Sequence, residues 1–235
     1  MIDVPALTVT GLSVRVDGGA DAPLVIVEDL NFSVRAGQLC CIVGRSGSGK
    51  TSVLRRIAGL IPPPPGTVDW GGVDASTLTD DEFARFRRGS LAYVDQDAAL
   101  VQELSVLENV QLPLLPDGRR RVRRSRREAV YILEALGLGD RLQWKPAVLS
   151  GGERHRTALA RAMIVAPRVL IADEPTASLD RGWAAEVVRI LRGHAARGGM
   201  VIAASHDPQL AAEADVVVRL EDGAVVADVH RPDSS

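Results

Sequence analysis

An eight-residue, glycine-rich segment constrains this chain more than any other part of it. Residues 44–51 read Gly-Arg-Ser-Gly-Ser-Gly-Lys-Thr, which matches the pattern G-x-x-x-x-G-K-[ST]. The apolar run at 39–43 predicts a buried strand directly before this segment, and residues 52–58 predict a helix start after it. A strand, a glycine-rich turn and a helix in this order predict a phosphate-binding loop.

The residue types in this loop suit the phosphate groups of a nucleotide. Gly44, Gly47 and Gly49 have no Cβ atoms, so the backbone can turn its N–H groups toward one point. That point lies at a helix N-terminus, which favours an anion. Lys50 brings a compact positive charge to the β- and γ-phosphates, and the Thr51 hydroxyl can ligate Mg²⁺. The predicted nucleotide-binding residues are Gly44, Arg45, Ser46, Gly47, Ser48, Gly49, Lys50, Thr51 and Ser52.

Composition and charge narrow the class of protein. The chain has 235 residues and a net charge of −2, so no overall basic field predicts nucleic-acid binding. Aromatic residues make up only 3%, which is few for base stacking. No apolar stretch reaches the roughly 18 residues of a transmembrane helix, and the N-terminus lacks a signal-peptide pattern. We therefore expect a cytoplasmic protein, with Cys40 and Cys41 as buried core residues.

The predicted elements fall into three groups. An antiparallel sheet is expected first, from strand-like segments at 7–9, 12–16, 24–27 and 31–34. Residues 62–66, four prolines and a glycine, are expected to end the first long helix. Helices are expected at 105–111 and 125–136. After residue 150, strands alternate with helices, which predicts parallel pairing and an α/β core.

The 235 residues could form one domain or two, and a single domain over residues 1–235 would contain two subdomains. The antiparallel β subdomain is expected from residues 1–38 and about 67–75, and a helical subdomain from about 98–150. The remainder would form the α/β core.

A strongly basic segment lies inside the helix-rich region. Residues 119–127 hold seven arginines in nine positions. One interpretation of such a run is a solvated helix start or loop. The other is a contact with an anionic membrane surface or with a partner.

Two carboxylates follow the apolar run at 169–172. Asp173 and Glu174 stand where a strand of an α/β sheet ends, and such sheets present ligands there. Asp173 is placed to hold the Mg²⁺ that bridges the phosphates, and Glu174 to orient or deprotonate an attacking water. An isolated pair of this kind could equally be an acidic helix cap. The phosphate loop in the same chain favours the catalytic interpretation.

A second glycine pair opens another predicted helix. Residues 149–153 read Leu-Ser-Gly-Gly-Glu, which combines a good N-cap residue with two glycines that let the backbone approach a ligand. A helix start of this kind is an anion site. An ordinary capped helix has the same pattern.

Taken together, these motifs resemble those of the ABC (ATP-binding cassette) ATPases. Residues 149–153 resemble the signature motif, and they follow the phosphate loop and Gln96 and precede the Asp173-Glu174 strand, as in that family. Residues 177–180 resemble the D-loop, and His206 resembles the switch histidine. The match covers nearly the whole chain. It implies an α/β P-loop NTPase fold, with a RecA-like core, an N-terminal antiparallel β subdomain and an inserted helical subdomain.

The resemblance also implies a mechanism. Two copies, most simply a homodimer, would pack head to tail around ATP. Each ATP would lie between one phosphate loop and the second copy's signature residues, which are Ser150, Gly151, Gly152 and Glu153. Thr51, Gln96 and Asp173 would hold Mg²⁺. Glu174, Gln96 and His206 would form the catalytic group, and Asp180 would lie at the dimer seam.

The expected partners follow from the same resemblance. ATP hydrolysis would move integral-membrane permease subunits from the cytoplasmic face of the membrane, and no nucleic-acid partner is expected. Residues 106–114 resemble the lipoprotein-release, macrolide-export and cell-division branch. Two alternatives stay open. The same ATPase cycle could signal through a membrane partner to a cell-wall or division machine, or the chain could be a nucleic-acid or ribosome-linked ABC protein.

Two positions depart from the family pattern. Many relatives stack adenine on an aromatic residue near the position of Val14 or Val16, and residues 6–30 contain no Phe, Tyr or Trp. We therefore expect weaker ATP affinity or looser discrimination between ATP and GTP. His155 stands where relatives often carry glutamine, and the sequence offers no interpretation of it.

Overall fold

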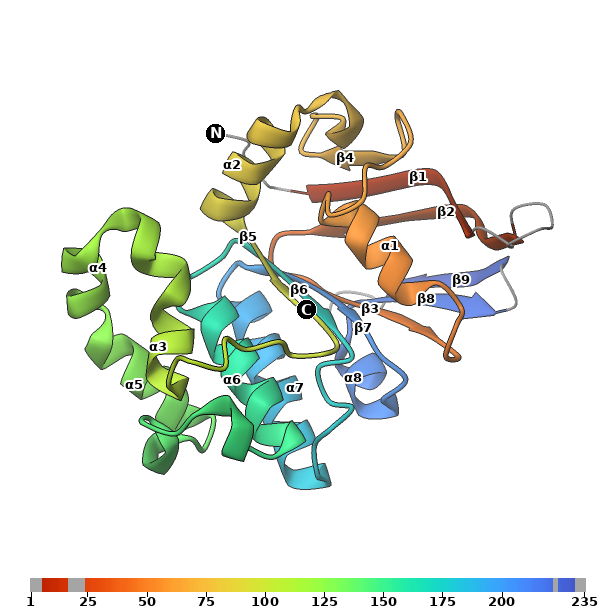
Figure 1. The fold of residues 1–235 in the computed structure, drawn as a ribbon. Coiled ribbons are helices and arrows are strands. Elements are labelled where there is room, and N and C mark those ends of the chain that lie inside the picture. The colour runs from red at the N-terminus through yellow and green to blue at the C-terminus, as the bar shows by residue number, and fades with distance from the viewer. Residues whose placement is uncertain (1–5, 17–23, 222–223, 231–235) are drawn as a thin grey trace.

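The fold is built on one mixed sheet. A computed structural model describes residues 6–16, 24–221 and 224–230 of the chain. Within these residues nine strands form one sheet in the order β4-β1-β2-β9-β8-β3-β7-β6-β5. Strands β1, β2 and β4 pair in antiparallel fashion, whereas β8, β3, β7, β6 and β5 run parallel. Figure 1 shows the antiparallel strands at one end of the sheet and most of the helices packed against the other part.

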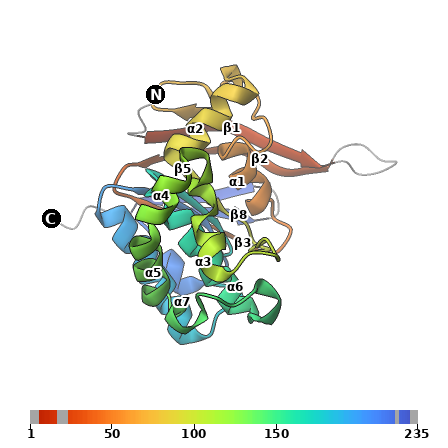
Figure 2. The ribbon, with the colours of Figure 1, turned by 60° about the vertical axis from the view of Figure 1, so that its left-hand side comes forward.

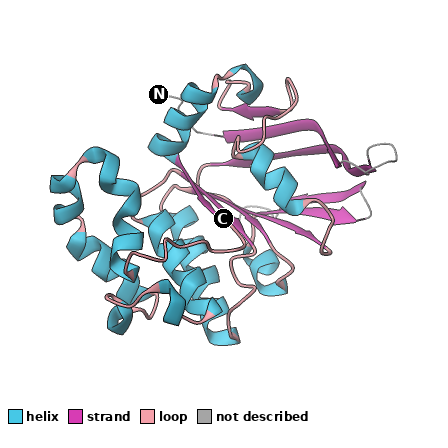
Figure 3. Cartoon of the chain, viewed as in Figure 1, coloured by secondary structure: helices cyan, strands magenta, loops and turns pink. Residues whose placement is uncertain are grey.

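The bounds of the elements are as follows. The strands are β1 (Ala6–Val16), β2 (Leu24–Arg35), β3 (Leu39–Gly44), β4 (Val68–Trp70), β5 (Leu91–Val94), β6 (Val169–Asp173), β7 (Met200–Ala204), β8 (Val216–Glu221) and β9 (Ala224–His230). The helices are α1 (Lys50–Ile57), α2 (Asp80–Ser90), α3 (Val106–Gln111), α4 (Arg119–Arg124), α5 (Arg126–Ala135), α6 (Gly151–Met163), α7 (Arg181–Ala196) and α8 (Pro208–Glu213). Short 3-10 turns lie at Ala75–Thr77, Leu112–Asp117, Gly139–Arg141 and Pro146–Val148 (Figure 3).

The parallel strands separate two hydrophobic cores. In β3, Leu39 and Cys41 face the core shared with α3, α5, α6 and α7, whereas Cys40 and Ile42 face the core shared with α1 and the antiparallel strands. This alternation is the two-residue period of a strand that is covered on both faces. Cys40 and Cys41 are both buried and form no disulfide, so the expectation that they are core residues is confirmed.

The four strand segments expected before residue 35 are two long strands in the structure. β1 and β2 continue through irregular points, with register shifts between Val9 and Val14. Gly11 adopts a φ of 62° and its N–H donates to Asn31 Oδ1 at 2.9 Å. The residues between the expected segments, such as Gly11, therefore belong to bulges and do not end the strands, because pairing with the neighbouring strand holds the chain on either side.

The first helix ends before the prolines that were expected to end it. α1 stops at Ile57, and Gly59 follows with a left-handed φ of 61°. The N–H of Leu60 donates to the Arg55 carbonyl oxygen at 2.8 Å, and the N–H of Gly59 donates to that of Arg56 at 3.0 Å. This is a Schellman-type end, in which a glycine rather than a proline closes the helix.

Helices α3 to α7 form the layer that covers one face of the parallel strands (Figures 1 and 2). Asn109, which is fully buried in α3, ties the loop before this layer to the helix. Its Oδ1 accepts from the Val101 N–H at 2.8 Å, and its Nδ2 donates to the Val101, Leu104 and Ser105 carbonyl oxygens. Among the described residues, no helix has both the length and the apolar character needed to cross a bilayer.

Candidate functional site

The phosphate-loop residues form the wall of the site. Gly47 and Gly49 have φ values of 83° and 92°, which side-chain-bearing residues rarely adopt. A Cβ atom at Gly49 would come within 2.7 Å of Val27 Cγ2, so glycine is also required there by packing. The loop borders a cavity of about 680 Å³. Its lining residues are Ile26, Arg45, Ser46, Gly47, Gly49, Lys50, Thr51, Ser52, Gln96, Glu174, Ala177 and His206.

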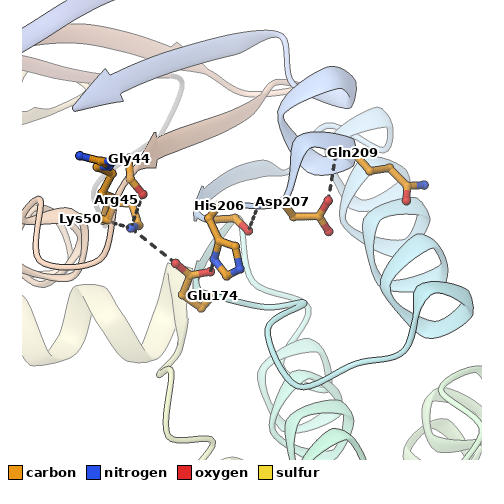
Figure 4. A network of polar contacts seen from close by, with 8 residues as sticks. Gly44, Arg45, Lys50, Glu174, His206, Asp207 and Gln209 are labelled. Atoms are coloured by element: carbon orange, nitrogen blue, oxygen red, sulfur yellow. Dashed lines mark hydrogen bonds and ion pairs between the residues drawn. The ribbon is translucent and has the colours of Figure 1, made fainter. Parts of the chain in front are cut away.

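Lys50 lies in this cavity at the first position of α1 and is only 7% exposed. Its Nζ donates to the carbonyl oxygens of Gly44 at 2.8 Å and Arg45 at 3.0 Å. The same Nζ lies 3.6 Å from Glu174 Oε1 (Figure 4). The carbonyl oxygens of the loop thus hold the Lys50 ammonium group beside the loop. A bound phosphate would compete with the Glu174 carboxylate for contact with this ammonium group.

Glu174 connects the loop to the ends of two neighbouring strands. It follows β6, adopts a left-handed φ of 49°, and its N–H donates to the Ala204 carbonyl oxygen of β7 at 2.8 Å. Its Oε2 lies 2.9 Å from His206 Nδ1 (Figure 4). The carboxylate is buried, whereas the His206 side chain is 70% exposed. A strained backbone at this position aims the carboxylate into the cavity.

Asp173 is a buried carboxylate to which none of the described residues donates a hydrogen bond of normal geometry. The residue is fully buried, and neither Oδ1 nor Oδ2 accepts a hydrogen bond of normal geometry among the described residues. Burial raises the pKa of Asp173 above its ordinary value, although the nearby Thr51 hydroxyl opposes this rise. A buried carboxylate whose oxygens accept no such hydrogen bond has lone pairs available to bind a hard cation such as Mg²⁺.

The oxygen donors near Asp173 are of the kind that Mg²⁺ prefers. Thr51 and Gln96 both line the cavity and supply a hydroxyl and an amide oxygen. The described residues contain no cluster of three or more His, Cys, Asp or Glu side chains able to hold a metal. A cation here would therefore be held by a few protein oxygens together with phosphate and water oxygens, as is usual for Mg²⁺.

The predicted signature residues lie outside this cavity. Ser150 caps α6, its Oγ accepts from the Glu153 N–H at 3.1 Å, and the Ser150 N–H donates to Glu153 Oε2 at 2.8 Å. Glu153 Oε1 is also paired with Arg141 at 3.2 Å. The capping box thus fixes the start of α6. A Cβ atom on Gly152 would lie 2.9 Å from the Ser178 carbonyl oxygen, so the signature segment packs on the segment before α7.

Asp180 begins the seventh helix on the protein surface. Its Oδ1 accepts from the Trp183 N–H at 3.0 Å, and the residue is exposed. One chain therefore presents two separate clusters, the cavity around Lys50 and the surface formed by residues 150–153 and 180.

A family model described as "ABC transporter" matches residues 27–177, which is well over half of the chain. The chain belongs to the ABC transporter family. The macrolide export ATP-binding/permease protein MacB of Burkholderia pseudomallei is 37% identical over 228 residues, which are 97% of this chain and 35% of that protein. An uncharacterized ABC transporter ATP-binding protein of Methanocaldococcus jannaschii, MJ1508, is 35% identical over 217 residues, covering 92% of this chain and 96% of that protein. The chain thus spans about a third of the length of the MacB relatives it matches.

Solved structures confirm the predicted α/β P-loop NTPase fold. The ATP-binding cassette MJ0796, in a dimeric post-hydrolysis state bound to ADP and Pi, superimposes with a TM-score of 0.85 at 28% identity. The match covers 95% of this chain and 98% of that one. A bacterial Atm1-family ABC exporter with ATP bound has the same fold, with a TM-score of 0.82 at 24% identity over 98% of this chain and 40% of that one.

Some residues of the ABC cassette site had no signal in the sequence. Ile26 in β2 lines the cavity but is an ordinary apolar residue with no motif around it, whereas Ala177 lines the cavity at the start of the segment that resembles the D-loop. Ile26 contributes an aliphatic side chain to the cavity, and none of the described lining residues is Phe, Tyr or Trp. His155 is buried in α6, and its Nε2 has no hydrogen-bond partner among the described residues. Burial lowers the pKa of His155 below its ordinary value, which keeps the ring neutral.

Proposed function

We propose that this chain binds and hydrolyses ATP as the motor domain of an ABC transporter. One observation carries this proposal: Lys50, Glu174 and His206 converge on a single cavity at the phosphate loop, next to the buried carboxylate of Asp173. Positive charge for the phosphates, oxygen ligands for a cation and a carboxylate for an attacking water are the parts that phosphoryl transfer to water requires.

Phosphate binding would use the loop backbone and Lys50. The N–H groups at the start of α1 would bind the phosphates, and Lys50 would exchange its contacts with Glu174 and the loop carbonyls for phosphate oxygens. Thr51, Gln96 and Asp173 would hold Mg²⁺. When bound, Mg²⁺ would supply positive charge that offsets the negative charge of the phosphate oxygens during phosphoryl transfer.

Hydrolysis would use Glu174 as the group that orients and deprotonates water. Its Oε2 contact with His206 fixes the direction of the carboxylate, and the departure of Lys50 on phosphate binding would leave it free to accept a proton. The exposed ring of His206 would reach the γ-phosphate.

A second copy would complete the site. Ser150, Gly151, Gly152 and Glu153 do not line the cavity of their own chain, so they would meet the nucleotide of a partner copy, with Asp180 at the seam. Glu153 would act mainly by holding the helix start, because its carboxylate is already engaged by Ser150 and Arg141. The structurally similar cassette MJ0796 is dimeric, which supports a homodimer.

The mechanical partner would be a membrane permease at the cytoplasmic face. The names of the MacB relatives join an ATP-binding part to a permease part, and this chain aligns to about a third of such a protein. We infer that closing and opening of the dimer around ATP drives that permease, in the manner of other ligand-gated closures.

Two substitutions test the proposal. Glu174→Gln should lower the ATP hydrolysis rate by at least about 100-fold, the contribution typical of a general base, while nucleotide binding persists. Lys50→Ala should weaken nucleotide binding itself. The exposed Glu213→Gln is the matched control and should leave both unchanged. Hydrolysis of ATP by Glu174→Gln at the parent rate would show that the general base is another group.

A further inference from the structure

Seven exposed arginines occupy two consecutive helices at the outer edge of the helical layer. α4 and the start of α5 carry this arginine surface, which consists of Arg119, Arg120, Arg121, Arg123, Arg124, Arg126 and Arg127. Figure 1 places α4 at the left edge of the molecule, away from β3 and α1, which flank the phosphate loop. We propose that the arginine surface binds the anionic phosphate headgroups of a lipid membrane. This contact adds to the proposed function and does not involve the ATP site.

The described residues leave most of the charge on this surface without an ion-pair partner. Between Asp117 and Glu134 seven arginines face three acidic residues, a net charge of +4, whereas the whole chain carries −2. Among the described residues, the seven form one ion pair, between Arg121 and Asp117 at 3.0 Å, in which both side chains are 56% exposed. The other guanidinium groups face solvent, where phosphate oxygens can bind them through paired hydrogen bonds.

The helix dipole disfavours some of these arginines and favours others, since Arg121, Arg123 and Arg124 lie in the last turn of α4, where cations are stabilised. The first turns of α4 and α5 hold Arg119, Arg120, Arg126 and Arg127, where the positive end of the helix dipole repels cations. Arg119 and Arg123, four residues apart, repel each other in the same way. An anionic surface would offset the repulsion that the first-turn arginines and the Arg119–Arg123 pair experience.

The backbone under the surface is firmly held. Gln111 Nε2 donates to the Val122 carbonyl oxygen at 2.6 Å and to Ser125 Oγ at 3.2 Å. Ser125 Oγ in turn donates to the Val122 carbonyl oxygen at 2.9 Å, and the Val122 side chain packs on the core. A prearranged set of charges loses less entropy on binding than a flexible tail does.

Two apolar side chains flank the arginines. Tyr131 is 73% exposed one turn after Arg127, and Leu115 is 51% exposed just before α4. Tyrosine and leucine beside basic residues suit the headgroup and upper acyl region of a bilayer. A single exposed aromatic residue offers little for stacking successive nucleic-acid bases, so the surface fits a membrane better than a nucleic acid.

Vesicle flotation with the full chain tests the inference. The vesicles are phosphatidylcholine alone or with about 30 mol % phosphatidylglycerol, at about 0.1 M and about 0.5 M NaCl. The test variant is R119Q/R120Q/R123Q/R124Q. The control R15Q/R35Q/R88Q/R197Q removes the same charge from exposed arginines elsewhere, and circular dichroism checks that both fold.

The arginine surface should bind only the anionic vesicles, and less at high salt. Each basic residue near an anionic surface strengthens binding by about fivefold, so the loss of four should weaken the binding of the test variant by about 600-fold, whereas the control should bind within about threefold of the parent. Lys50→Ala should float normally despite losing nucleotide, which separates this inference from the proposed ATPase function.

Three results would overturn the inference. These are no flotation with anionic vesicles, equal loss in the two quadruple variants, and equal binding to neutral vesicles. Tighter binding of single-stranded RNA than of anionic vesicles, lost in the test variant alone, would assign the surface to nucleic acid instead.

Discussion

Asp173→Asn should make the nucleotide-free protein more stable while removing its Mg²⁺-dependent nucleotide binding. The carboxylate is fully buried, and neither oxygen has a hydrogen-bond partner among the described residues. Leaving a buried charged group unsatisfied costs more than leaving a neutral amide there. The neighbouring Glu174 adds repulsion, which also raises the pKa of Asp173.

The expected gain follows from that difference. Replacing the charge by an amide of the same shape should raise the free energy of unfolding by about 1–2 kcal/mol. For a chain of this size each kcal/mol corresponds to about 2–4 °C in Tm, so a rise of about 2–8 °C is expected. Urea unfolding in the presence of a chelator measures the stability, and calorimetric titration of ATP with and without Mg²⁺ measures the lost function.

Asp215→Asn is the matched control with the opposite expected sign. Asp215 Oδ2 accepts from the Leu39 N–H at 2.8 Å and pairs with Arg192, so its charge is satisfied. The same substitution there should lower the free energy of unfolding by about 1–3 kcal/mol. Destabilisation by Asp173→Asn, or unchanged Mg²⁺-dependent binding of ATP, would refute the assignment of Asp173 as a Mg²⁺ ligand.

Two further predictions concern His155 and the base of the nucleotide. Burial and the nearby Arg154 lower the pKa of His155 below 6.5 in the folded chain, partly offset by Asp97. The unfolded chain takes up a proton as the pH falls below that value and the folded chain does not, so stability is lost on acidification. His155→Gln should make urea stability decline less between about pH 7 and about pH 5. Part of the slope should remain, because burial also lowers the pKa of His194; an unaltered slope would contradict this account. Ile26 is the only described cavity residue of β2, so β2 offers no aromatic ring on which adenine could stack. The Kd values for ATP and GTP should therefore agree within about tenfold. Tight, adenine-selective binding in a titration would argue against it.

Most elements of this fold could be predicted because their signals are local. The run at 169–172 and the carboxylates after it mark β6 and its end. The predicted ends of strands and helices were wrong where contacts with residues distant in the sequence determine them. Gly11 became part of a bulge because β2 continues the pairing, and α1 ended at a glycine supported by hydrogen bonds rather than at the prolines.

The sequence by itself determined which residue types gather at the phosphate loop, since glycine, lysine and threonine at fixed spacing follow from local backbone geometry. Only the tertiary structure decided how they act together. It set Lys50 at 3.6 Å from Glu174, isolated Asp173 from every hydrogen-bond donor of normal geometry among the described residues, and kept residues 150–153 outside the cavity of their own chain. The physical reason is that burial and strand order bring together side chains more than a hundred residues apart, and no local pattern encodes the resulting distances or the loss of solvent.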